Sequence, residues 1–208
     1  MIHQDKPEIV YWLNNSLYLN ITNKCSNKCW FCFRNFKKGV RDFNLKLKKE
    51  PKVDEIKTKL ETVFRLRRWD EVVFCGFGEP TERLDALLDI VRYVRKRVSF
   101  PIRVDTNGHG YVLNEGREVA EEMNRAGVSS VSVSLNGYDK TSYEENCRPE
   151  FSGGFEAVLE FIRKAKKAGL SVEVSAIRMP EVDIDKVRKI ARSLGVPLRI
   201  RDYIQCFS

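Results

Sequence analysis

The sequence predicts an α/β fold, a partial (β/α)6 barrel with parallel strands, and two patterns support this prediction. Strand-like segments alternate with segments of helical apolar spacing along the chain. Within the strands, apolar and polar side chains mostly alternate, so one face packs on helices and the other lines a wet or occupied lumen. A closed eight-stranded barrel would fill its lumen with branched apolar residues. A half-exposed antiparallel sheet also alternates, but the intervening helical segments argue against it.

The predicted elements follow one another from the N-terminus. A hairpin is expected where Asn14 and Asn15 separate two strand-like segments. Six strands are expected at 17–22, 71–75, 102–106, 131–135, 172–177 and 198–203. Five amphipathic helices are expected from apolar stripes at Ile56, Leu60, Val63 and Phe64; at Leu84, Leu87, Leu88, Val91 and Val94; at Val119 and Met123; at Phe155, Val158, Leu159 and Ile162; and at Ile184, Val187, Ala191 and Leu194. Parallel pairing with helical crossovers makes the barrel TIM-like.

The composition indicates one soluble domain covering residues 1–208. No segment approaches the roughly 18 apolar residues of a membrane span, and residues 1–12 lack the apolar core of a signal peptide. We therefore expect a cytoplasmic protein that does not enter a membrane. The net charge of +8 is spread along the chain, so it fits either an anionic partner or a solvated basic surface.

Three of the six cysteines, Cys25, Cys29 and Cys32, lie within eight residues directly after the first predicted strand. Such density indicates a metal site. A [4Fe–4S] cluster usually takes four cysteines, so three would leave one iron open for chemistry. Structural zinc is the alternative, because both spacings suit a zinc loop. Zinc needs a fourth ligand, however, and after Cys32 no cysteine or histidine follows until Cys75.

The CxxxCxxC pattern, with Phe31 before its third cysteine, resembles the signature of the radical S-adenosylmethionine (radical SAM) superfamily. The resemblance implies that Cys25, Cys29 and Cys32 hold a [4Fe–4S] cluster whose free iron binds S-adenosyl-L-methionine. It also implies reductive cleavage of that cofactor to a 5′-deoxyadenosyl radical, which abstracts hydrogen from a substrate.

Further motifs resemble the same family and fall at predicted strand ends. Segment 75–81 (CGFGEPT) is similar to its Gly-Gly-Glu-Pro element, 105–108 to its Thr-Asn-Gly element, and 134–137 to a Ser-Leu-Asp-Gly element with Asn136 replacing Asp. The first segment is also explained by a strand-to-helix turn with Thr81 as N-cap. Arg148 is a candidate to neutralise the cofactor carboxylate, and an ordinary surface arginine is the alternative. The resemblance implies these cofactor-binding residues: Phe31, Gly76, Gly78, Glu79, Asn107, Ser134, Asn136 and Arg148.

Most of the chain also resembles the small radical SAM proteins associated with TatD-type nucleases, which implies a functional link to such a nuclease. The cluster loop is expected at 23–34 and a basic connector at 34–52. Residues 34–50 carry seven basic residues interleaved with Phe36, Phe43, Leu45 and Leu47, a composition suited either to nucleic acid or to a solvated connector. Cys75, Cys147 and Cys206 are too scattered for a second cluster and are expected to be buried thiols.

The expected function is a radical SAM enzyme acting on an anionic substrate: a small metabolite, a nucleotide or RNA. An external flavodoxin- or ferredoxin-like protein would supply the electron. Alternatives are an activase that acts on a protein partner, or a non-enzymatic, zinc-stabilised nucleic-acid-binding module. The candidate substrate-binding residues, charged or polar and predicted to face the lumen or follow a strand, are Arg103, Asp105, His109, Glu173, Arg199 and Arg201.

Overall fold

An antiparallel hairpin starts the sheet, as the Asn14–Asn15 pair predicts. The computed structural model describes residues 7–203, in which β1 (Val10–Leu13) pairs with β2 (Ser16–Leu19). Asn14 has φ of 53°, a left-handed conformation that asparagine tolerates better than most residues. The hairpin prediction is confirmed.

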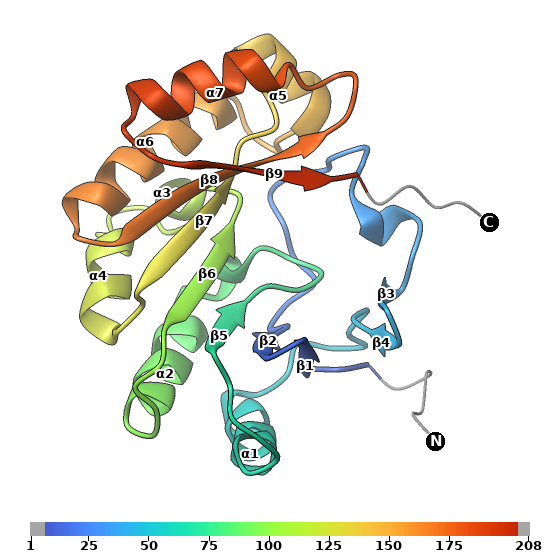
Figure 1. The fold of residues 1–208 in the computed structure, drawn as a ribbon, viewed down its shortest axis with the longest axis vertical. Coiled ribbons are helices and arrows are strands. Elements are labelled where there is room, and N and C mark those ends of the chain that lie inside the picture. Colours follow the sequence, from blue (N-terminus) through green and yellow to red (C-terminus); the bar gives the residue numbers. More distant parts are fainter. Residues whose placement is uncertain (1–6, 204–208) are drawn as a thin grey trace.

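The remaining strands of the main sheet run parallel to β2 and curl into a half-barrel (Figure 1). The spatial order is β1-β2-β5-β6-β7-β8-β9, so each strand pairs with its predecessor in the sheet. The partial-barrel prediction is confirmed, and the predicted strands agree with the observed ones to within three residues at each end. The strands are β5 (Glu71–Phe74), β6 (Ile102–Thr106), β7 (Ser130–Ser134), β8 (Ser171–Arg178) and β9 (Leu198–Asp202).

Helices cover the convex face of this sheet (Figure 1). The five predicted helices are α1 (Val53–Phe64), α2 (Leu84–Arg95), α4 (Val119–Ala126), α6 (Gly154–Lys167) and α7 (Ile184–Ser193). Two further helices are present, α3 (Gly110–Leu113) and α5 (Lys140–Cys147), together with the 3-10 turns η1 (Phe33–Asn35) and η2 (Pro80–Arg83). No helix among residues 7–203 is long and apolar enough to cross a bilayer.

The core lies between the helices and the apolar face of the sheet. Every residue of the predicted α2 stripe is at most 2% exposed, and Val131, Val133 and Leu135 are buried against the helices. The alternating polar residues of the same strands face the concave side, because successive side chains of a strand point to opposite faces. The predicted two-faced sheet therefore holds, with its polar face left for the site.

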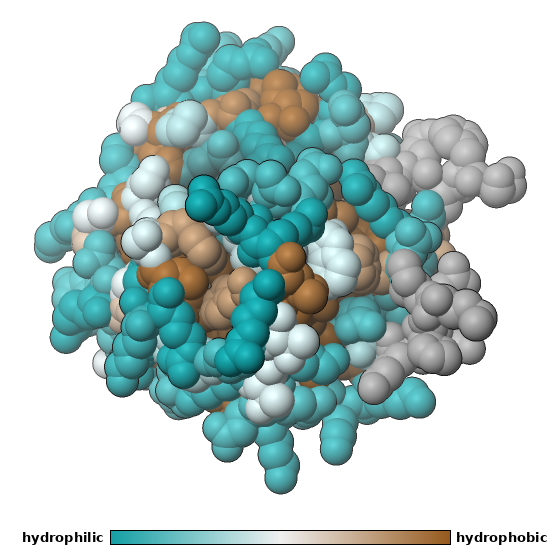
Figure 2. Space-filling model, turned by 60° about the horizontal axis from the view of Figure 1, so that its bottom comes forward, coloured by the Kyte–Doolittle hydropathy of each residue, from teal (hydrophilic) through white to brown (hydrophobic). Residues whose placement is uncertain are grey.

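The basic connector is folded rather than extended. It contains a small hairpin of β3 (Gly39–Val40) and β4 (Phe43–Asn44), which the sequence did not predict. Leu45 and Leu47 are buried and Phe43 packs on Tyr11, whereas Phe36 is 54% exposed. Hydrophilic side chains dominate the face shown in Figure 2, with hydrophobic patches between them.

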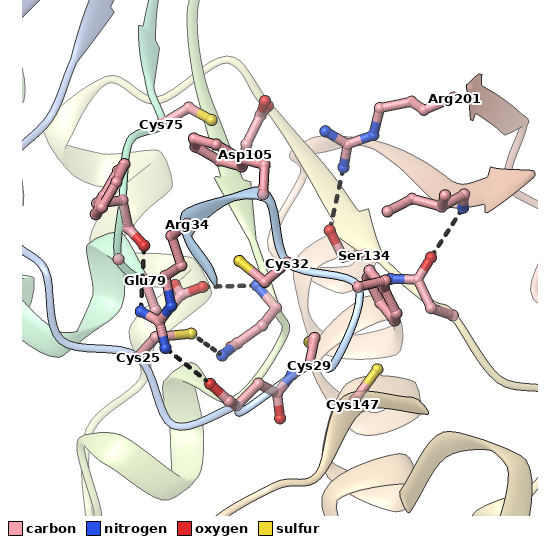
Figure 3. A pocket seen from close by; sticks show the side chains of 18 of the residues that line it. Cys25, Cys29, Cys32, Arg34, Cys75, Glu79, Asp105, Ser134, Cys147 and Arg201 are labelled. Carbon is pink, nitrogen blue, oxygen red and sulfur yellow. Dashed lines mark hydrogen bonds between the residues drawn. The ribbon is translucent and has the colours of Figure 1, made fainter. Parts of the chain in front are cut away.

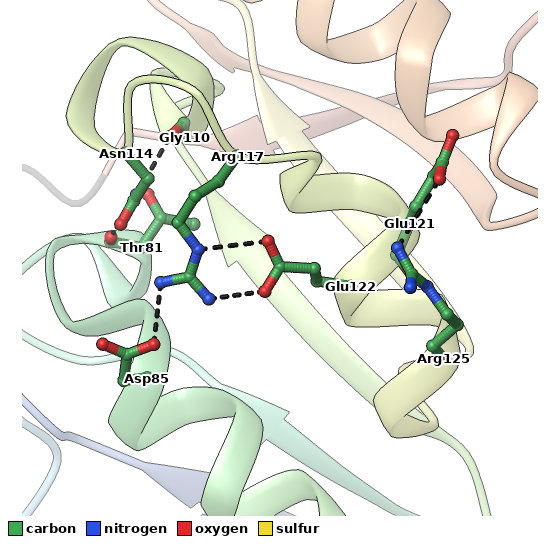
Figure 4. A network of polar contacts seen from close by, with 8 residues as sticks. All are labelled: Thr81, Asp85, Gly110, Asn114, Arg117, Glu121, Glu122 and Arg125. Atoms are coloured by element: carbon green, nitrogen blue, oxygen red, sulfur yellow. Dashed lines mark hydrogen bonds and ion pairs between the residues drawn. The ribbon is translucent and has the colours of Figure 1, made fainter.

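A polar network ties the helices behind the site together (Figure 4). Asn114 donates to the carbonyl oxygens of Thr81 (3.0 Å) and Gly110 (2.9 Å), which joins η2 to α3. Arg117 forms ion pairs with Asp85 of α2 and Glu122 of α4. This network lies on the helical side of the molecule and supports η2, which directly follows the glycine loop of the site.

Candidate active site

A cavity of about 260 Å³ lies at the carboxyl ends of the parallel strands. One wall is the segment 23–34, here called the cysteine loop, and the opposite wall is the polar face of the sheet (Figure 3). Barrel enzymes place their sites at this end of the strands. The predicted motifs that meet here come from the cysteine loop, from 75–79 after β5, from 105–107 at the end of β6, and from 134–136 at the end of β7.

The three predicted cluster ligands, Cys25, Cys29 and Cys32, all line this cavity. Burial raises the pKa of Cys25 to about 12 and also raises the pKa of Cys32. A hydrogen bond with the Cys147 thiol, followed by burial, raises the pKa of Cys29. The three thiols are therefore protonated at neutral pH and would release protons on binding a metal, since the thiolate is the ligand.

Arg34 fixes the shape of the cysteine loop. Its guanidinium donates to the carbonyl oxygens of Asn23 (3.1 Å), Asn27 (3.2 Å) and Phe77 (3.2 Å). The first two bonds close the loop on itself, and the third joins it to the glycine segment after β5. One arginine thus crosslinks the two segments that carry the strongest motifs.

His109 anchors the same loop from behind. It is fully buried, its Nδ1 lies 2.9 Å from Ser26 Oγ, and its Nε2 lies 2.9 Å from Tyr143 Oη. Asn27 Nδ2 donates to that same tyrosine oxygen at 3.1 Å. Burial lowers the pKa of His109 to about 4, so the imidazole is neutral at physiological pH.

Glu79 joins the end of β5 to the end of β6. The carboxylate accepts hydrogen bonds from Thr81 N (3.0 Å), Thr106 Oγ1 (2.8 Å) and Asn107 N (2.6 Å). Burial nevertheless raises its pKa, because these hydrogen bonds only partly offset the loss of hydration. Glu79 is the N-cap of the turn η2, so the alternative prediction that Thr81 is the N-cap is wrong.

Asn107 links β6 to the cysteine loop. Its amide donates to Ser26 Oγ at 2.9 Å and lies 3.8 Å from Cys25 Sγ. Gly108 follows with φ of +83°, a left-handed conformation that suits glycine at this turn. Asn107 therefore stands at the junction of β6 and the loop, next to a predicted ligand.

The two glycines after β5 permit a close approach between backbone segments. A Cβ on Gly78 would lie 2.2 Å from the Lys24 carbonyl oxygen, and one on Gly76 would lie 2.2 Å from Asn20 Oδ1. The atoms that leave no room for a side chain at these two positions are therefore protein atoms, from Lys24 and Asn20. The glycines thus let the segment after β5 pack against the cysteine loop and the end of β2.

Ser134 and Asn136 both line the cavity. Asn136 Oδ1 accepts a hydrogen bond from Ile177 N at 2.9 Å, which ties the end of β7 to β8. Phe31, the aromatic residue of the cysteine motif, is also buried in the cavity wall and packs edge-on to Trp30 with 5.7 Å between ring centroids.

Among the candidate substrate residues, Asp105 and Arg201 line the cavity, whereas the other four do not. Arg103 lies in the lumen, where it pairs with Glu71 (3.5 Å) and Asp105 (3.0 Å). Arg199 and Glu173 lie 3.9 Å apart and outside the cavity lining. His109 lies behind the loop, and its contacts are with protein groups.

Arg148, predicted to contact the cofactor, is exposed at the end of α5 and absent from the cavity lining. Cys147 is buried, as predicted, whereas Cys75, also predicted to be buried, is half-buried; both line the cavity. Cys206 lies outside the described residues. The structure also brings Asn27, Arg34 and Phe77 to the site, which sequence reasoning missed. Of these three residues, only Arg34 had a signal in the sequence, its position just after the third cysteine.

The donor set suits an iron–sulfur cluster, because three thiols of one loop face one cavity and thiolates select such clusters. Within residues 7–203, no group of three or more His, Cys, Asp or Glu side chains is already arranged to hold a metal ion. The cavity wall also contains Asn27 Oδ1, a buried acceptor without a hydrogen-bond partner in the described part of the chain. Such an atom needs a donor from a ligand or water.

Comparison with known proteins places this chain in a family. The model of the radical SAM superfamily matches residues 19–194. A provisionally named glycyl-radical enzyme activating enzyme of Methanocaldococcus jannaschii is 30% identical over 174 residues, covering 82% of this chain and 65% of that protein. A provisionally named GTP 3′,8-cyclase of Methanococcus maripaludis is 29% identical over 193 residues, covering 91% of this chain and 59% of that protein. The chain thus spans about three fifths of the length of these curated relatives.

Solved structures share the fold. Streptococcus suis SuiB bound to S-adenosylmethionine superposes with a TM-score of 0.71 at 14% identity, covering 93% of this chain and 42% of that one. Native anSMEcpe with bound AdoMet gives a TM-score of 0.67 at 17% identity, covering 90% of this chain and 51% of that one. With the family model matching well over half of its residues, the chain belongs to the radical SAM superfamily.

Proposed function

We propose that this enzyme holds a [4Fe–4S] cluster on Cys25, Cys29 and Cys32 and binds S-adenosyl-L-methionine beside it. The observation that carries the proposal is the meeting of these three thiols with the segments after β5, β6 and β7 around one cavity. Bound there, the two cofactors supply reductive cleavage of the sulfonium to a 5′-deoxyadenosyl radical for hydrogen abstraction.

The chain's own residues position these groups and exclude water. Arg34 and the Ser26–His109–Tyr143 network hold the cysteine loop against the barrel. Both carboxylate oxygens of Glu79 accept hydrogen bonds from protein donors, so its proposed role includes positioning Asn107 at the cavity. Phe31 and the apolar atoms of the wall keep the site dry.

The test is anaerobic reconstitution with iron and sulfide, followed by dithionite reduction with S-adenosylmethionine and quantification of 5′-deoxyadenosine. Wild-type protein and Cys75→Ala should both bind about four irons, because Cys75 lines the cavity outside the proposed ligand set. Cys29→Ala should lose stable iron binding and 5′-deoxyadenosine. A colourless wild-type protein that binds stoichiometric zinc instead would contradict the proposal.

A second candidate is an activase that acts on a protein partner, and the similarity to a glycyl-radical enzyme activating enzyme favours it. Substrate molecules below 3 kDa and protein fractions from the source cell separate the two ideas. Stimulation of 5′-deoxyadenosine formation by the small-molecule fraction supports the first candidate. Stimulation by the protein fraction, abolished by heat, supports an activase.

For the electron donor we propose an acidic flavodoxin- or ferredoxin-like protein. Lys24 and Lys28 on the cysteine loop are 68% and 69% exposed, although they pair with Glu50 and Glu150, and Lys37 and Lys38 follow on the surface. An acidic donor would be steered to this loop by charge complementarity. The links to a TatD-type nuclease and to nucleic acid, and the cytoplasmic location, stay predictions.

A further inference from the structure

The polar face of the sheet contains one arginine that has no acidic partner. Arg103 and Arg199 each have a carboxylate within 4.0 Å. Arg201, from β9, has hydroxyl partners: Nη2 donates to Ser175 Oγ at 2.6 Å and to Ser134 Oγ at 3.2 Å. Among the residues described by the structure, no carboxylate lies within ion-pair distance of it.

The same guanidinium retains unused hydrogen-bonding capacity. Arg201 Nε is buried and has no hydrogen-bond partner in the described part of the chain. Of its five N–H donors, only those on Nη2 have partners among residues 7–203. Asp105 lines the same cavity and interacts electrostatically with Arg201, but its ion-pair partner is Arg103. A partly buried cation without an ion-pair partner of its own costs stability. The free donors of this guanidinium are therefore available to a ligand that binds in the cavity.

The position of Arg201 indicates which kind of ligand it can bind. Figure 3 shows Arg201 on the opposite side of the cavity from Cys25 and Glu79. Ile177 and Tyr203 also line the cavity wall, so a ligand bound here meets apolar surface as well as the cation. The two serines occupy Nη2 and hold the guanidinium plane in place, which leaves Nε and Nη1 as charged donors for a carboxylate or a phosphate.

We propose that Arg201, oriented by Ser134 and Ser175, binds a carboxylate or phosphate group of the substrate. The inference rests on the proposed function, because it takes the cavity to be the radical site. It narrows the substrate class to molecules that carry such a group and are small enough to bring it to β9. The competing assignment is the carboxylate of S-adenosylmethionine itself.

The test measures three dissociation constants by calorimetry on the full chain: inorganic phosphate, acetate, and S-adenosylmethionine. The two anions are titrated into reconstituted protein saturated with the cofactor and into protein without iron. The variant Arg201→Gln should weaken the better-bound anion at least tenfold and leave S-adenosylmethionine within twofold. Arg163→Gln, an exposed arginine of α6 outside the cavity lining, is the matched control and should change neither.

A milder variant guards against a folding defect. Ser175→Ala removes one hydroxyl that orients the guanidinium and should weaken the anion about threefold. The more tightly bound anion tells phosphate from carboxylate. With reconstituted protein, a tenfold loss of S-adenosylmethionine affinity in Arg201→Gln would reassign Arg201 to the cofactor. Equal anion binding by wild type and Arg201→Gln would overturn the proposal.

The two proposals fail separately. A protein that never forms a cluster refutes the proposed function, yet its iron-free form still reports whether Arg201 binds anions. Conversely, normal 5′-deoxyadenosine formation with no anion site at Arg201 leaves the radical chemistry intact and refutes only this inference. In reduced protein, hyperfine coupling between the cluster and ³¹P of bound phosphate provides a readout that does not depend on activity.

Discussion

The two walls of the cavity are built on opposite principles. On the cysteine loop, Ser26, Arg34 and His109 are engaged by protein groups, and Asn27 Oδ1 is the unpartnered exception. On the sheet wall, Asp105 Oδ1 is held by Arg103 Nε at 3.0 Å, whereas Arg201 has a buried Nε without a hydrogen-bond partner and no carboxylate within 4.0 Å in the described chain. The satisfied wall has a geometry to maintain, whereas the unsatisfied wall keeps capacity for a ligand.

The largest expected effect comes from pushing the loop away. Gly78→Ala places a Cβ against the Lys24 carbonyl oxygen, a backbone atom, and should cost about 3 kcal/mol of stability. Iron content after reconstitution should fall with it. Gly116→Ala is the control: it carries the strain of positive φ, about 1 kcal/mol, but meets no atom within 4 Å. Equal iron content in both variants would show that the loop tolerates displacement.

The buried histidine makes the loop wall sensitive to acid. The pKa of His109 is about 4 in the folded protein and near 6.5 when unfolded. Because the folded pKa is lowered, the stability that depends on a neutral His109 is present above pH 6.5 and is lost as the pH falls towards 4. Between pH 7.5 and pH 5, the free energy of unfolding in urea should fall by about 2 kcal/mol more for the wild type than for His109→Gln. Parallel losses in the two proteins would contradict the neutral buried imidazole.

Single truncations on the two walls should differ in sign or size. Ser26→Ala leaves His109 Nδ1 and Asn107 Nδ2 without their shared partner and should cost about 1–3 kcal/mol. Arg201→Met removes an unpaired cation and should leave the unfolding free energy within about 1 kcal/mol, or raise it. Chemical denaturation of both variants measures this. A larger loss for Arg201→Met than for Ser26→Ala would refute the contrast between the walls.

The smallest effect is expected away from both walls. Arg117→Ala removes ion pairs to Asp85 and Glu122 on the helical side, and Asp85 is 89% exposed. Exposed pairs contribute about 1 kcal/mol or less. Iron content and cofactor affinity should stay at wild-type values, measured on the same preparations. A loss of iron here would mean that the helix network controls the loop.

The sequence was informative where one period or one motif dominates. Alternation in strands such as 102–106 and 131–135 predicted the sheet and its polar face, since each residue's face follows from its parity. The cysteine spacing and the glycine segment identified the motifs that the structure brings together. Short apolar stripes were enough for α2, whose predicted residues are all buried.

Other features depend on tertiary contacts that leave little local signal. Helix α5 was missed because its buried side chains, including Ser142, Asn146 and Cys147, are not an apolar stripe; its capping signal from Asp139 and Ser142 was available. The two-residue strands β3 and β4 are too short for a period. His109 was assigned to substrate although it is buried, because burial of a loop residue is set by distant segments such as α5.

The bond pattern around the cysteine loop has a consequence for its dynamics. Lys28 N donates to the carbonyl oxygen of Cys147 (3.0 Å), Glu150 N donates to that of Ser26 (2.9 Å), and Asn27 bridges to Pro149 in antiparallel fashion. A segment without regular secondary structure thus borrows a partner strand from the turn after α5. Its amide hydrogens should therefore exchange with solvent at rates closer to those of the sheet than to those of a surface loop.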